Sequence, residues 1–166
     1  MRYLFLLLVF IATAACADDP RPFNPGDYPP AVQKALQDAV EVCRNEDGGP
    51  VTFAPDTVRK IDLTGDGRDD YIVDLRDTRC GDRETTYCGT GGCTLTILVT
   101  LPDADLRPVF DGRVLDYKVL AKPMKRGAAR TIRFALHGGY CGGFGAQACS
   151  REQAISAKPF AFKMPQ

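Results

Sequence analysis

The sequence has no excess of charge of either sign. Its 166 residues carry 21 Lys and Arg against 21 Asp and Glu, so the formal net charge at pH 7 is 0. Proteins that bind nucleic acid or anionic membranes as their main partner usually have a marked basic excess or a basic run. The balanced charge therefore argues against both kinds of partner.

The sequence has little histidine and no cysteine pair of the C-x-x-C type. The only histidine is His137, and no C-x-x-C pair occurs, so a zinc site of the usual spacing cannot be drawn. The serine motif G-x-S-x-G is absent too. Residues 88–93 (CGTGGC) lack the lysine and helix start of a phosphate-binding loop. His137 is therefore expected to be structural or to lie at a rim, because a catalytic base needs a nucleophile and an orienting partner.

Long apolar runs are confined to the first residues. Residues 3–12 are apolar, follow Arg2 and lead into the small residues T-A-A-C-A at positions 13–17. This pattern predicts a secretory signal peptide over residues 1–17, a periplasmic or secreted location and no transmembrane segment in the mature chain. The alternative is a lipoprotein anchored at Cys16, because T-A-A-C resembles the lipid-attachment box of bacterial lipoproteins.

The cysteines are few but even in number once Cys16 is set aside. Six cysteines in an exported chain indicate three disulfides. Glycines beside the cysteines of two short segments allow the tight turns that small disulfide loops require. The predicted pairs are Cys43–Cys80, Cys88–Cys93 and Cys141–Cys149, and other pairings remain open from sequence alone.

The rest of the chain reads as one domain behind a leader. Residues 18–30 hold five prolines and predict an extended, Pro-rich leader. Residues 31–44 repeat apolar side chains at i, i+3, i+4 and i+7, which predicts a helix. Short β-type runs follow Pro50. The sequence therefore predicts a single α+β domain over residues 31–166, with one N-terminal helix packed on an antiparallel sheet of five to seven strands.

Two segments of the predicted sheet carry distinct signals. Residues 93–101 interleave threonine with larger apolar residues, which is typical of a central strand. The dipeptide Asp111-Gly112 is a two-residue turn signal, so a hairpin is expected between residues 106–110 and 113–120.

The stretch of residues 61–75 (IDLTGDGRDDYIVDL) predicts a metal loop. Oxygen-bearing side chains recur around a glycine at the sixth position, an arrangement that folds a backbone around a hard cation such as calcium. The predicted calcium ligands are Asp62, Thr64, Asp66, the carbonyl of Arg68, and Asp70. The alternative is an Asp/Gly-rich turn without an ion. Val73 stands where an EF-hand would place its bidentate glutamate.

This loop resembles the D-x-D/N-x-D-G-x-x-D loop of FG-GAP or VCBS-type repeats of secreted proteins. The resemblance covers about fifteen of the 166 residues. It implies a calcium site between two strands. It does not imply the propeller that such repeats build, because a propeller needs several blades and the chain has one copy.

No catalytic constellation emerges from these residues. The sequence therefore predicts an exported, non-enzymatic domain with a structural calcium loop, acting as a binding or envelope-associated protein on an unknown protein or envelope ligand. One alternative is a periplasmic enzyme inhibitor that presents Phe144 at the tip of the loop formed by residues 141–149. A second alternative is a hydrolase that uses His137 or calcium.

Overall fold

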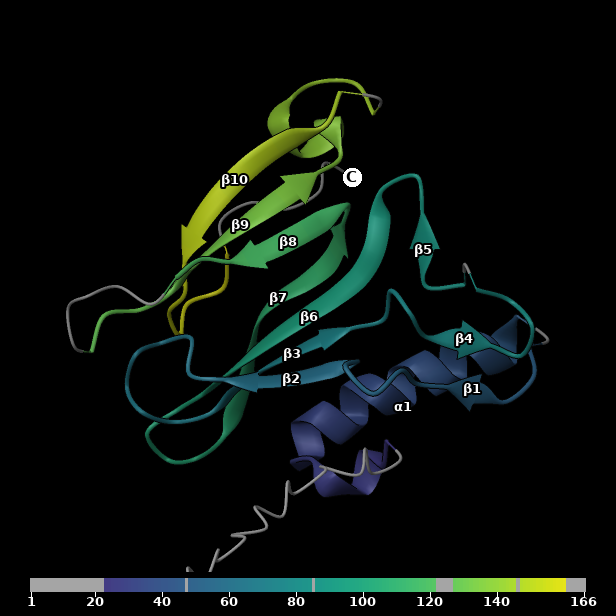
Figure 1. Ribbon diagram of the computed structural model, residues 1–166, viewed down its shortest axis with the longest axis horizontal. Helices are drawn as coiled ribbons and strands as arrows, with labels where there is room; N and C mark the ends of the chain where they lie inside the picture. Colours follow the sequence, from purple (N-terminus) through teal and green to yellow (C-terminus); the bar gives the residue numbers. More distant parts are fainter. Residues whose placement is uncertain (1–22, 47, 85, 122–126, 146, 161–166) are drawn as a thin grey trace, which may run out of the picture.

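The computed structural model describes residues 23–46, 48–84, 86–121, 127–145 and 147–160 (Figure 1). The predicted signal peptide and Cys16 lie outside these residues. Within them the chain forms one α-helix, two short 3-10 helices and ten strands, all paired antiparallel. The α+β class is confirmed. One sheet has five strands, within the predicted five to seven, and the remaining strands form a three-stranded and a two-stranded sheet.

The helices are η1 (Pro25–Asp27), α1 (Pro30–Asn45) and η2 (Gly138–Cys141). The strands are β1 (Val51–Thr52), β2 (Val58–Ile61), β3 (Asp70–Asp74), β4 (Arg79–Cys80), β5 (Cys88–Gly89), β6 (Gly92–Thr100), β7 (Leu106–Val114), β8 (Asp116–Val119), β9 (Thr131–Leu136) and β10 (Cys149–Ala154). Three of them, β1, β4 and β5, are only two residues long.

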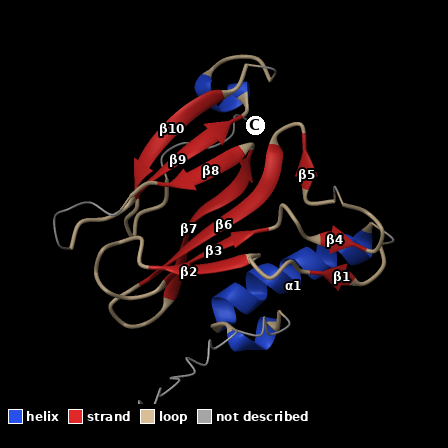
Figure 2. Cartoon of the chain, in the orientation of Figure 1, coloured by secondary structure: helices blue, strands red, loops and turns tan. Residues whose placement is uncertain are grey.

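The elements form three layers (Figure 2). The main sheet has the order β2-β3-β6-β5, with β7 also paired to β6, and the second sheet has the order β10-β9-β8. Helix α1 covers one face of the main sheet, and the second sheet covers the other. A short β1-β4 pair lies beside the end of α1.

Alternation along the central strands separates two cores. On β3, Ile72 belongs to the core between the sheets, whereas Tyr71 and Val73 belong to the core beneath α1. Successive strand residues point to opposite faces, which accounts for this division. Helix α1 contributes a buried stripe at helical spacing: Val32, Leu36, Ala39 and Cys43.

The three disulfides pair as the cysteine spacing predicted. Cys43–Cys80 joins α1 to β4, Cys88–Cys93 joins β5 to β6, and Cys141–Cys149 closes the loop between η2 and β10. Each bridge stabilises the fold by roughly 2–4 kcal/mol, mainly because it restricts the conformations open to the unfolded chain. Among the described residues, no helix has both the length and the apolar character needed to span a bilayer.

The described part of the predicted leader is not an extended spacer. Residues 25–27 form η1, where the Asn24 side chain accepts a hydrogen bond from the Gly26 backbone N–H. The ring of Phe23 lies 5.6 Å from that of Tyr28 and 5.3 Å from that of Phe53. These aromatic contacts fold residues 23–28 onto the core beneath α1.

The hairpin expected at Asp111-Gly112 is wrong, because β7 continues through both residues to Val114. Asp111 pairs with Thr96 across the ladder and accepts a hydrogen bond from its hydroxyl at 3.2 Å. A Cβ at Gly112 would lie 3.3 Å from the Phe110 ring, so this glycine gives room to a packed aromatic side chain. Tertiary packing overrides the local turn signal here.

Candidate functional site

The acidic loop between β2 and β3 is closed by its own hydrogen bonds. The two carboxylate oxygens of Asp62 accept from the backbone N–H of Gly65 at 2.7 Å and of Gly67 at 3.2 Å. Asp66 accepts from the backbone N–H of Arg68 at 2.8 Å and pairs with its guanidinium at 2.6 Å. Both carboxylates therefore hold the turn, and Asp66 already has a cationic partner.

Asp70 faces the protein interior and is fully buried. One of its oxygens accepts from the backbone N–H of Leu63 at 2.8 Å and of Thr64 at 2.9 Å, and the other accepts from Thr100 at 2.8 Å. Burial raises the pKa of this carboxyl, although the three backbone bonds oppose the rise. Asp70 thus links the loop to β6 through hydrogen bonds.

These contacts define what calcium would have to displace. A cation at Asp66 would compete with Arg68, and one at Asp70 would compete with three backbone donors. The described residues contain no group of three or more His, Cys, Asp and Glu side chains placed to hold a metal ion. The buried hydroxyl of Thr64, at position three of the predicted loop, has no hydrogen-bond partner. Calcium binding by this loop stays a prediction.

The His137 side chain bonds to the backbone of its own loop. It caps η2, and its Nδ1 accepts from the backbone N–H of Gly139 at 3.3 Å. Its Nε2 packs against Gly145, where a Cβ would approach to 2.3 Å. Nδ1 is thus bonded within the loop and Nε2 lies beside its backbone, and no nucleophile among the described residues bonds to the imidazole.

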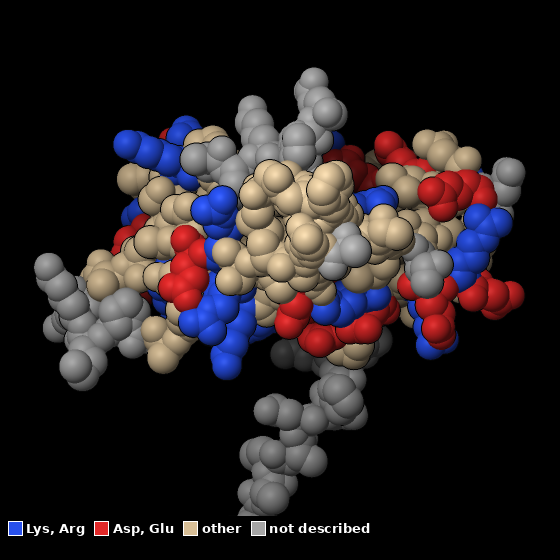
Figure 3. Space-filling model, turned by 90° about the horizontal axis from the view of Figure 1, so that it is seen from above, with Lys and Arg blue, Asp and Glu red and all other residues tan. Residues whose placement is uncertain are grey.

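That loop presents Phe144, whose exposed fraction is 83%. The backbone N–H of Gly143 donates to Gly138 at 3.0 Å, and that of Gln147 donates to Phe144 at 2.9 Å. The Cys141–Cys149 disulfide closes the same segment. In Figure 3, the central surface nearest the viewer carries no charged side chains, in keeping with the uncharged sequence of this loop.

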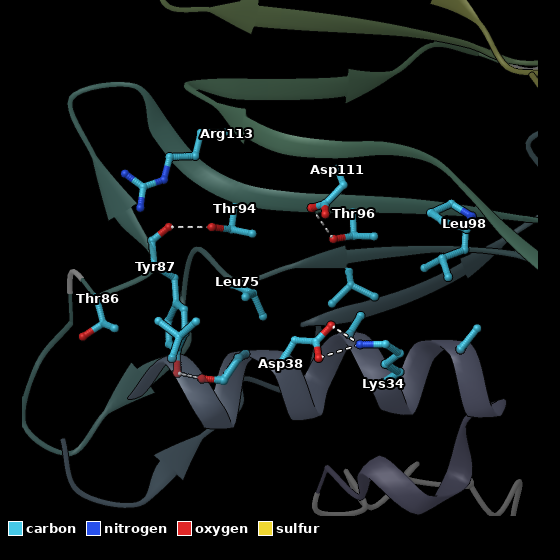
Figure 4. Close-up of a pocket in the computed structure, with 16 residues that line it drawn as sticks. Lys34, Asp38, Leu75, Thr86, Tyr87, Thr94, Thr96, Leu98, Asp111 and Arg113 are labelled. Atoms are coloured by element: carbon cyan, nitrogen blue, oxygen red, sulfur yellow. Dashed lines mark hydrogen bonds and ion pairs between the residues drawn. The ribbon is translucent and has the colours of Figure 1, made fainter. Parts of the chain in front are cut away.

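Sequence reasoning missed a groove of about 420 Å³ between α1 and the helix-facing side of the main sheet (Figure 4). Its floor is apolar and comes from β3 and β6. The residues that form this groove are Ala31, Lys34, Ala35, Asp38, Ala39, Val42, Val73, Leu75, Thr86, Tyr87, Thr94, Thr96, Leu98, Pro108, Asp111 and Arg113.

The groove exists because small side chains lie where α1 passes over the sheet. Ala31, Ala35 and Ala39 recur every four residues and line it along one helical row. Val42 follows on the same wall and is 44% exposed, although it is apolar. This alanine row was the one signal in the sequence, but alanines flanking an apolar stripe are equally common in packed helices.

Most polar groups around the groove are already paired. Lys34 and Asp38 form an ion pair at 2.8 Å on α1. The Thr94 hydroxyl donates to the Tyr87 carbonyl at 3.2 Å, and the Tyr87 hydroxyl donates to the Ala39 carbonyl at 3.0 Å. Burial, and secondarily the charge of Glu46, raises the pKa of Tyr87, so its phenol remains a hydrogen-bond donor at neutral pH.

Two polar groups at the β5 end of the groove lack such partners. Among the described residues, no carboxylate lies within ion-pairing distance of the Arg113 guanidinium, and no hydrogen bond to it forms. The Thr86 hydroxyl oxygen is buried and has no hydrogen-bond partner. In Figure 4 the two side chains lie on different sides of Tyr87, and the Thr86 hydroxyl points away from Arg113.

Comparison of the chain with protein-family models, with curated proteins and with solved structures finds no match. The geometry of the groove and of the loops therefore carries the functional argument.

Proposed function

We propose that the chain is an exported, non-enzymatic binding protein whose ligand lies in the groove between α1 and the main sheet. The observation that carries the proposal is a preformed groove of about 420 Å³ with an apolar floor. Ligand pockets span roughly 300–1,000 Å³ and are mostly apolar, with a few placed polar groups. Val73, Leu75 and Leu98 supply such a floor.

Preorganisation supports this proposal, because a rigid groove loses little conformational entropy on binding. Cys43–Cys80 fixes the end of α1. The buried hydrogen bond from Tyr87 to Ala39 ties the opposite wall to the same helix. Cys88–Cys93 holds the β5–β6 hairpin next to Tyr87. The two walls are thus fixed to each other before any ligand arrives.

Export is supported by the predicted signal peptide and by the three disulfides, which persist in oxidising compartments. In this proposal the acidic loop is structural. Calcium is its predicted ion, and residues 62–70 are its predicted site. The pattern of the sequence and the unpartnered Thr64 hydroxyl support that assignment.

The test is a titration with the neutral apolar fluorophore N-phenyl-1-naphthylamine. The mature wild-type chain is expected to give saturable one-to-one fluorescence enhancement. Ala35→Phe, which fills the groove, should abolish it. Gln37→Phe places the same ring at an exposed position of α1 and should leave it intact. Equal binding by both variants, with matching circular dichroism, would overturn the proposal.

A second candidate function is inhibition of an enzyme by the loop of residues 138–149. The exposed ring of Phe144 favours it, because a large apolar side chain on a disulfide-closed loop is a suitable anchor for a partner's pocket. The glycines on either side of Phe144 leave the ring as the only bulky group of this tip.

A further inference from the structure

Arg113 offers a positive charge at one end of the groove. It extends from β7 over the β5–β6 hairpin, where a Cβ on Gly89 would lie 3.0 Å from its Nη1. The hairpin sequence CGTGGC at residues 88–93 contains no acid. The nearest acid on its own strand face, Asp111, accepts from Thr96 instead. The guanidinium therefore has an open planar fork, a geometry that matches a carboxylate or phosphate.

The other charges that face the groove do not compete for an anion. Lys34 is neutralised by Asp38 on α1. Asp111 lies farther along β7, next to Thr96, and its negative charge disfavours an anion in the middle of the groove. An anionic group is thus directed to the β5 end, and the apolar floor is left for a hydrocarbon.

We propose that the ligand is a single-chain amphiphile with an anionic head group, either a carboxylate or a phosphate. The head group binds at Arg113, and the aliphatic chain lies on Val73, Leu75 and Leu98. This inference rests on the proposed function. A plain hydrocarbon would leave Arg113 without an ionic partner, and a small anion alone would leave the floor in water.

The experiment measures displacement of N-phenyl-1-naphthylamine by four ten-carbon compounds below their micelle concentrations: decanoate, decyl phosphate, 1-decanol and decyltrimethylammonium. The two anions should bind roughly tenfold or more tightly than the alcohol, because charge-assisted hydrogen bonds are the stronger class. The ammonium compound should bind most weakly. A preference for one anion over the other identifies the head group.

Two variants locate the head group. Arg113→Gln should weaken decanoate binding about tenfold and leave 1-decanol unchanged. Arg151→Gln, which removes an exposed arginine on β10, is the matched control and should change neither.

The failures of the two proposals are distinguishable. Equal affinity for decanoate and 1-decanol, or an unchanged decanoate affinity in Arg113→Gln, would overturn the head-group assignment while leaving the groove as an apolar site. No displacement by any compound, with a fluorophore signal that Ala35→Phe does not affect, would overturn the groove itself. A concentration-dependent dimer lost in Ala35→Phe, without amphiphile binding, would replace the ligand with a second copy of the chain.

Discussion

The phenol hydroxyl of Tyr87 donates a buried hydrogen bond to the backbone carbonyl of Ala39, and the two atoms are 3.0 Å apart. These residues are 48 positions apart in sequence and lie on opposite walls of the groove. Tyr87 also precedes the Cys88–Cys93 bridge. One hydrogen bond and one disulfide therefore set how far the β5 wall lies from α1.

Tyr87→Phe is expected to destabilise the fold by about 1 kcal/mol, the usual net loss for a hydrogen bond. Urea denaturation measures this change. The variant should also weaken ligand binding, because the wall is no longer tied to α1. Tyr140→Phe is the control, since it removes an exposed hydroxyl bonded to the Arg113 carbonyl at 3.1 Å. Equal, negligible losses in both variants would contradict this view of the groove wall.

The free energy of unfolding is expected to depend on pH through the carboxyl group of Asp74. Burial raises the pKa of this carboxyl, while the Arg76 backbone and charge oppose the rise. A raised folded-state pKa stabilises the folded chain below the unfolded pKa, and that contribution is lost as pH rises through the folded value. The wild type should therefore lose stability relative to Asp74→Asn as the pH rises above the unfolded aspartate pKa of about 4. Urea titrations at several pH values test this, and a constant difference would contradict it.

Calcium should raise the melting temperature of the oxidised chain if the acidic loop binds it. An ion present at about one hundred times its Kd adds about 2.7 kcal/mol to the folded state. Thermal unfolding in calcium and in chelator measures the effect. Asp66→Asn, which removes a carboxylate oxygen from the loop, should abolish it. If the wild type unfolds identically in calcium and in chelator, residues 62–70 form a turn without an ion, held by the hydrogen bonds of Asp62, Asp66 and Asp70.

Phe144 should matter for a partner and not for the fold. Its side chain is 83% exposed, so Phe144→Asp should change the unfolding free energy by less than about 0.5 kcal/mol. The inhibitor alternative predicts that this variant loses a protein captured from envelope extract by the wild type. Ser150→Asp adds the same charge at an exposed position of β10 outside the groove and is the matched control. A partner captured equally by all three chains would count against the loop.

Local chemistry accounts for the parts of the fold that were predictable from sequence. The apolar spacing from Val32 to Cys43 marks α1, because helical periodicity is a short-range property. The disulfide pairs followed from glycines beside closely spaced cysteines, which left Cys43 and Cys80 for each other. The α+β class follows from one helix and many short β-type runs.

Features that depend on distant contacts were not predictable. Asp111-Gly112 reads as a turn, but Thr96 and Phe110 hold it inside β7. The bonds from the backbone N–H groups of Leu63, Thr64 and Thr100 to Asp70 could not be predicted either, and calcium binding by Asp70 stays a prediction. The groove depends on how alanines of α1 lie over β3 and β6, which no single segment encodes.

The most direct test of the account is a ¹H–¹⁵N NMR titration of the oxidised mature chain with decanoate. The account predicts saturable shifts confined to the backbone amides that line the groove, with the largest at Tyr87 and Arg113. Arg113→Gln should remove the shifts at the β5 end at the same decanoate concentration. An unchanged spectrum, or shifts centred on Phe144, would contradict the claim that the groove is the binding site.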